Sequence, residues 1–286
     1  MTSHAAASRA RRWRVHAAWT VVVCAALAAV TWQVVAAGPI TALDRPIHEA
    51  VDPDQPTGAA LALCVGVARL GQRWLTVPLL LGLGAWVSLR RRDPRPLFAP
   101  VVGLASLAVL GTLLKVAVGR TPPITGVDVV SPGLGNVADW AVAAFTLGAA
   151  PFEGYVSYPS GHAANAALSY PLLACLLFGG NGLRPGRIAL RRALWASAVP
   201  VLAVGVMMTA LDYHWASEAL GGWFLGIACA LAALLVLGPG RAAEAPAGHP
   251  PQGEHAEGNV TAGEAVYREN SITGGRSVVP KSGGTG

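Results

Sequence analysis

The segment 215–237, WASEALGGWFLGIACALAALLVL, holds a single charged residue, Glu218, close to its beginning. A helix that crosses about 30 Å of hydrocarbon needs roughly 20 apolar residues, so this segment predicts a transmembrane helix. The whole chain agrees, because 53% of its 286 residues are hydrophobic and only 13% are charged. Such a composition excludes an ordinary soluble domain and predicts an all-α, polytopic membrane protein.

Other segments share the length and apolar character of a membrane span. Together they predict a bundle of six transmembrane helices, near residues 17–37, 73–89, 96–118, 161–180, 191–211 and 215–237. The apolar stretch 58–70 is too short to cross, and it predicts an interfacial or re-entrant helix. A cleaved signal peptide is the alternative for the first segment. We expect a retained anchor, because the run is long and no clear small-residue cleavage site precedes Asp44.

Clusters of arginine predict how the bundle is oriented. They comprise Arg9, Arg11, Arg12 and Arg14, then Arg90, Arg91, Arg92 and Arg95, and finally Arg184, Arg187, Arg191 and Arg192. Because short cytoplasmic loops collect Lys and Arg, six spans with both termini in the cytoplasm place all three clusters on that side. Topology therefore accounts for the net charge of +6, and we expect no nucleic-acid partner.

Composition divides the chain into three parts. Residues 1–16 form a basic cytoplasmic N-terminus, 17–237 the membrane domain, and 238–286 a disordered cytoplasmic tail rich in Gly, Pro, Ala, Glu and Ser. The four cysteines are scattered singly through apolar stretches, which is typical of packing residues rather than of disulfides or a metal site.

Polar residues gather at the extracytoplasmic ends of the predicted spans. Lys115 and Arg120 end the third span, the segment 159–162 (Pro-Ser-Gly-His) begins the fourth, and His214 precedes the sixth. A serine that caps a helix favours an anion at the helix start, and a histidine can move a proton. Cations at this side run against the positive-inside bias, so they either snorkel to the headgroups or bind an anion. The layer predicts a site that handles phosphate.

His214 and Glu218 are four residues apart, so on a helix they share a face and the carboxylate can accept from one imidazole nitrogen. The other nitrogen is then free to attack phosphorus, while His162 protonates the departing oxygen. Asp212 is a second candidate for the acidic partner, although helix termination is the simpler reason for an aspartate there.

This set of residues resembles the type 2 phosphatidic acid phosphatase family, the membrane lipid phosphatases related to vanadium haloperoxidases. The family pattern is Lys-x6-Arg-Pro, Pro-Ser-Gly-His and Ser-Arg-x5-His-x3-Asp. The similarity runs from Asp44 to Gly226; the middle motif is complete, Lys115 and Pro123 match the first, and His214 matches the third.

The departures from the pattern concern mainly its arginines. Pro122 stands in place of the first arginine, Met207 and Met208 in place of the Ser-Arg pair, and Glu218 in place of the aspartate. The missing positive charge could be supplied by Arg120, Arg69 or Arg73. Because phosphoryl transfer depends on stabilising the charge of the phosphate oxygens, these losses bear directly on catalysis.

The resemblance implies a metal-independent phosphatase of the plasma membrane, without a cofactor, that hydrolyses a lipid phosphomonoester or polyprenyl diphosphate at the extracytoplasmic face. The richness of the chain in Ala, Gly, Pro and Arg suits a bacterial source. His214 would form a phosphohistidine, His162 would be the acid for the leaving alcohol, and Glu218 would orient His214. The phosphate would be held by Lys115, Arg120, Ser160 and Gly161. The alternative is a weakened or inactive relative that binds or helps to move anionic lipids. The sequence does not indicate an oligomeric state.

Overall fold

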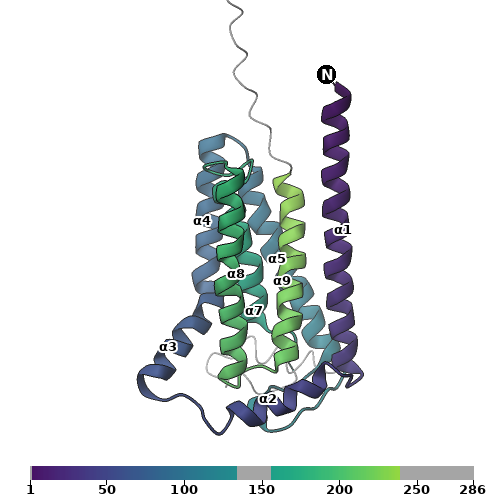
Figure 1. The fold of residues 1–286 in the computed structure, drawn as a ribbon, viewed down its shortest axis with the longest axis vertical. Helices are drawn as coiled ribbons and strands as arrows, with labels where there is room; N and C mark the ends of the chain where they lie inside the picture. The colour runs from purple at the N-terminus through teal and green to yellow at the C-terminus, as the bar shows by residue number, and fades with distance from the viewer. Residues whose placement is uncertain (1, 134–155, 239–286) are drawn as a thin grey trace, which may run out of the picture. The chain divides into compact units, whose positions relative to one another are not determined.

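The computed structural model describes residues 2–133 and 156–238, and within these ranges it contains helices and connections but no β-strand. The helices are α1 (Thr2–Val35), α2 (Asp44–Val51), α3 (Gly58–Ala68), α4 (Arg73–Arg91), α5 (Arg95–Val118), α7 (Gly161–Phe178), α8 (Arg187–Ala210) and α9 (Ala216–Leu237), with short 3-10 turns η1 (Thr41–Leu43), η2 (Arg69–Gly71) and η3 (Pro123–Thr125) (Figure 1). The prediction of an all-α protein is confirmed. The tail predicted from residue 238 onward lies, from residue 239, outside the described residues.

Five helices are long and apolar enough to cross a membrane: the part of α1 from Trp13 to Val35, and α5, α7, α8 and α9. The sixth predicted span forms α4, which packs against α5 and α7 but begins at Arg73 and ends at Arg91, and it does not meet the same standard of length and hydropathy. The short apolar stretch forms α3, whose 11 residues cannot cross. The chain is therefore a multi-pass membrane protein, with five clear spans rather than six in the part that the structure describes.

Helix α7 is the most enclosed of the five, with 61% of its apolar window buried, and it packs against α4, α5, α8 and α9. Its contact with α9 is very close, because glycines of α9 face the backbone of α7. A β-carbon added at Gly222 would lie 2.5 Å from the carbonyl oxygen of Ser160, and one at Gly226 would collide with the carbonyl oxygen of Ala164. Lipid gives little hydrophobic drive to helix association, so such small-residue contacts hold membrane helices together. The starts of α7 and α9 are thereby fixed side by side.

The two ends of the bundle differ in character. The α4–α5 turn, which carries Arg90 to Arg95, lines a cavity of about 850 Å³ together with Asn181 and Leu183 of the α7–α8 connection. The end of α9 is there too, because the Asn181 amide donates to the carbonyl oxygen of Leu237 at 2.6 Å. Helix α2 and the starts of α7 and α9 lie at the opposite end (Figure 1). Two of the predicted arginine clusters therefore lie away from the predicted site, although their cytoplasmic location stays a prediction.

We expect Gly226→Ala to destabilise the protein because the added methyl group must push α9 away from α7. Overpacking of this kind costs about 1–3 kcal/mol and would lower the thermal midpoint of a protein of this size by roughly 2–12 °C. The measurement is thermal unfolding of the purified protein in detergent micelles. The matched control is Gly82→Ala in α4, where nothing lies within 4 Å of the added carbon. Equal midpoints for the two variants would contradict the close α7–α9 contact.

Candidate functional site

His214 and Glu218 meet at the beginning of α9. His214 lies just before the helix, and Glu218 lies in its first turn, where its carboxylate accepts from the backbone N–H of Trp215 at 3.3 Å. The Nδ1 atom of His214 is 2.7 Å from Oε2 of Glu218, and both residues are buried. Because a carboxylate only accepts, this contact assigns the hydrogen to Nδ1 and leaves the lone pair of the imidazole on Nε2.

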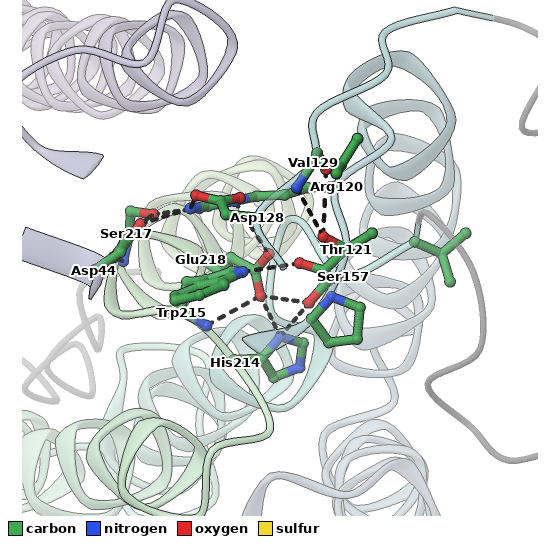
Figure 2. Close-up of polar contacts among 12 residues, drawn as sticks. Asp44, Arg120, Thr121, Asp128, Val129, Ser157, His214, Trp215, Ser217 and Glu218 are labelled. Atoms are coloured by element: carbon green, nitrogen blue, oxygen red, sulfur yellow. Dashed lines mark hydrogen bonds and ion pairs between the residues drawn. The ribbon is translucent and has the colours of Figure 1, made fainter. Parts of the chain in front are cut away.

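Ser157 is a third member of this contact that the sequence analysis missed. Its hydroxyl donates to Oε2 of Glu218 at 2.5 Å and lies 3.1 Å from Nδ1 of His214 (Figure 2). Ser157 is 57 residues from His214 in the chain and is outside all three family motifs. No local signal could have identified it.

The Pro-Ser-Gly-His segment is joined directly to the same helix start. The backbone N–H of Ser160 donates to the carbonyl oxygen of Glu218 at 3.0 Å, and the Ser160 side chain caps α7 by accepting from the N–H of Ala163 at 3.5 Å. His162, in the first turn of α7, is half-buried and lies close enough to His214 for their charges to interact. The two histidines therefore belong to one layer of the structure.

Lys115, near the end of α5, reaches the same layer. Its ammonium group donates to the carbonyl oxygens of Val156 and Ser157, the latter at 3.4 Å, so it also braces the segment that leads into α7. Next to it is a cavity of about 250 Å³, which is lined by Arg73, Leu107, Gly111, Thr112, Lys115, Pro159, Gly161, Ala164 and Leu225. The cavity has cations on part of its wall and aliphatic side chains on another part.

Arg120 is brought to the site but does not face this cavity. Its side chain is completely buried, and its guanidinium donates to Asp128 at 2.8 and 2.7 Å, to Asp44 at 2.8 Å and to Ser217 at 2.7 Å (Figure 2). Its Nε atom is 4.0 Å from the second carboxylate oxygen of Glu218. Four of its five N–H groups are thus engaged by protein atoms.

These partners stabilise the charged form of Arg120. Burial by itself would lower the pKa of Arg120, but the hydrogen bond with Asp128 and the charges of Glu218, Asp44 and Asp128 outweigh it and raise that pKa above its ordinary value. The guanidinium also lies over the ring of Trp215, 5.2 Å from its centre. Arg120 is therefore a permanent cation inside a shell of carboxylates.

Helix α2 takes part through Asp44, whose carboxylate caps α9. It accepts from the backbone N–H of Ser217 at 2.8 Å and from the Ser217 hydroxyl at 2.5 Å, where a negative charge suits the helix dipole. Asp212 contacts α2 as well, since His48 Nδ1 lies 2.7 Å from its carboxylate. Between the two acidic candidates, the structure thus places Glu218, and not Asp212, against His214.

The two positions where the family pattern has arginine are occupied by buried, uncharged residues. Met208 is 1% exposed and packs in an apolar cluster with Ala68, Ala166, Val204 and Leu211. Pro122 is buried at the start of η3. Neither residue is part of the cavity wall. Within the described ranges, no group of three or more His, Cys, Asp or Glu side chains is placed to hold a metal ion.

Comparisons with known proteins identify a similar fold and a matching family model. The chain is similar in fold to a crystal structure of a transmembrane PAP2-type phosphatidylglycerolphosphate phosphatase from Bacillus subtilis, with a TM-score of 0.58 and 20% sequence identity, over 75% of this chain and 93% of that chain. A search of curated proteins gives no match. The family model of the PAP2 superfamily matches residues 96–240, which include both histidines, Lys115 and Glu218. The chain therefore belongs to the PAP2 superfamily.

Proposed function

We propose that this protein is a membrane phosphatase that hydrolyses a lipid phosphomonoester or a polyprenyl diphosphate at the extracytoplasmic face through a phosphohistidine intermediate. The observation that carries the proposal is the Glu218–His214 contact of 2.7 Å, which leaves the lone pair of His214 on Nε2, in the same layer as His162 and Lys115. The cavity of this layer is lined by Lys115 and by Pro159 and Gly161 of the Pro-Ser-Gly-His segment, although neither histidine is part of its wall. A nucleophile, an acid and a cation at one end of a membrane bundle suit phosphoryl transfer to the protein.

The reaction would proceed in two displacements. Nε2 of His214 attacks phosphorus and forms the P–N bond, the P–O bond to the lipid breaks, and His162 gives its proton to the departing lipid oxygen. Water then attacks the phosphorus of the phosphohistidine and gives a proton to His162. A new P–O bond forms, the P–N bond breaks with its electron pair returning to Nε2 of His214, and phosphate leaves. Glu218 and Ser157 hold the Nδ1 side of His214 in both steps, which supports the growing positive charge on the imidazole.

A lipid substrate fits the surroundings of the cavity. Leu107, Leu225 and Ala164 line it together with Lys115, so a phosphate at the lysine leaves the first carbons of its lipid against aliphatic side chains. The extracytoplasmic location rests on the separation between this end of the bundle and the arginine-rich turns at the other end.

For Arg120 we propose a positioning role in place of direct phosphate contact. Its donors face Asp44, Asp128 and Ser217, and it lies 4.0 Å from the Glu218 oxygen that does not contact His214. The arginine would therefore act through Glu218, by holding that carboxylate in place beside His214.

A weakened relative that binds or helps to move anionic lipids is the second candidate, and one observation favours it. The buried positions of Met208 and Pro122 leave the site without the two arginines of the family pattern. Because such a relative needs the cations but not the nucleophile, the two functions differ in their dependence on His214.

We expect His214→Ala to abolish phosphate release from lipid phosphates, because no other described group replaces the Nε2 nucleophile. Native protein incubated with substrate and quenched in alkali should carry a phosphate that is labile to acid and hydroxylamine, and chelators should not change the rate. The measurement is phosphate release in detergent micelles from phosphatidate, phosphatidylglycerol phosphate and a polyprenyl diphosphate, with His16→Ala in α1 as the control. Undiminished release by His214→Ala would contradict the mechanism.

We expect Arg120→Ala to lower stability strongly, because it leaves buried carboxylates without a counter-charge. Breaking one partner of a buried ion pair costs about 3–5 kcal/mol, and Arg120→Ala combined with Asp44→Asn should recover part of that loss. The control is Arg45→Ala, since its exposed pair with Glu49 contributes about 0–1 kcal/mol. Thermal unfolding in micelles measures all four proteins. A stable Arg120→Ala protein that no longer binds lipid phosphate would instead indicate direct phosphate contact.

A further inference from the structure

We propose that Arg73, the first residue of α4, is the arginine that binds the substrate phosphate in this protein and replaces the arginines absent from the family pattern. The inference rests on the proposed phosphatase function and adds to it a binding residue outside the three motifs. It is carried by the position of α4 against α7 and by the cavity that Arg73 shares with Lys115.

The start of α4 is held directly against the first turns of α7. A β-carbon added at Gly71 would lie 2.6 Å from the carbonyl oxygen of His162, so only glycine permits this approach. The buried Asn165 amide donates to the carbonyl oxygen of Gly71 at 2.8 Å and to the Thr76 hydroxyl at 2.6 Å. Arg73 lies between these two anchored positions, so its backbone is fixed beside the proposed acid, His162.

The Arg73 side chain lines the 250 Å³ cavity together with Lys115, although the two residues come from different helices. Their charges interact with each other and with His162. Two cations that face one cavity repel each other, and the repulsion is relieved when an anion lies between them. No hydrogen bond or ion pair joins the Arg73 guanidinium to another side chain among the described residues, so its planar donors are free for phosphate oxygens.

The other two candidate arginines are less suitable. Arg120 has four of its N–H groups engaged by Asp44, Asp128 and Ser217. Arg69, four residues before Arg73, is not part of the cavity wall. Of these three arginines, only Arg73 lines the cavity and has guanidinium N–H groups that no other described side chain engages.

The wall also indicates the class of ligand. Lys115 and Arg73 provide charge, while Leu107, Leu225 and Ala164 provide an aliphatic surface. A phosphate ester with a hydrocarbon chain satisfies both parts, whereas inorganic phosphate satisfies only the cations. The experiment must therefore compare a lipid phosphate with free phosphate.

The test uses the full-length protein in detergent micelles and dioctanoyl phosphatidate as the probe. We expect Arg73→Ala to lower kcat/KM at least tenfold, which is the effect of losing one charge-assisted hydrogen bond, and Arg73→Lys to lower it less. Arg69→Ala is the matched control and should retain the native rate. Millimolar guanidinium chloride should restore part of the Arg73→Ala rate, because the small cation can enter the exposed position. A purely structural role would give no such rescue.

Binding to His214→Ala, which carries out no turnover under the proposed mechanism, separates the possible failures. Calorimetry should show an affinity for dioctanoyl phosphatidate that falls at least tenfold when Arg73→Ala is added, a weaker Arg73-dependent affinity for inorganic phosphate, and no Arg73 dependence for dioctanoylglycerol. Native hydrolysis with an unaffected Arg73→Ala would overturn the role of Arg73 and leave the phosphatase function standing. Arg73-dependent binding without any hydrolysis would support the anion site and overturn the phosphatase function. Neither hydrolysis nor binding would overturn both.

Discussion

A guanidinium group held out of water is the constraint on which this end of the molecule depends. An isolated charge in a low-dielectric interior is costly, so a fully buried Arg120 requires partners in fixed places. Those partners belong to α2, to the segment after η3 and to the beginning of α9. The charge is neutralised only when these parts of the chain meet. Burial of Arg120 therefore depends on the same contacts that bring Ser217 and Glu218 of α9 into the site.

Glu218 connects that ion-pair cluster to the histidine. One of its oxygens faces Arg120 at 4.0 Å, and the other accepts from Ser157 and from the backbone of Trp215 and contacts His214 at 2.7 Å. A single carboxylate thus serves both the architecture and the proposed chemistry. The family pattern has the shorter aspartate here, and the extra methylene of glutamate does not prevent the contact with His214.

Local signals in the sequence were sufficient for much of this structure. Long apolar runs predicted six spans, and five of them form helices that are long and apolar enough to cross a membrane. The other, α4, has arginine at both ends and does not reach that standard of length and hydropathy. Four-residue spacing predicted the His214–Glu218 contact. Contacts between distant segments could not be predicted from the sequence. Asp44 and Ser217 are 173 residues apart, and no motif near Ser157 indicates that it lies beside His214. Arg120 was identified as a cation of this layer, but its carboxylate partners could not be inferred.

The close approach of α7 and α9 also bears on how such a sequence can diverge. Steric exclusion acts over a fraction of an ångström, so the α9 position opposite the Ala164 carbonyl admits glycine and little else. Electrostatic attraction acts over several ångströms, so a cation can attract the same anion from any of several neighbouring helices. Over evolutionary time, the glycines that let α9 approach α7 are therefore expected to vary less than the cations around the cavity. This helix contact, which takes no part in the proposed reaction, would then identify distant relatives better than the cations do.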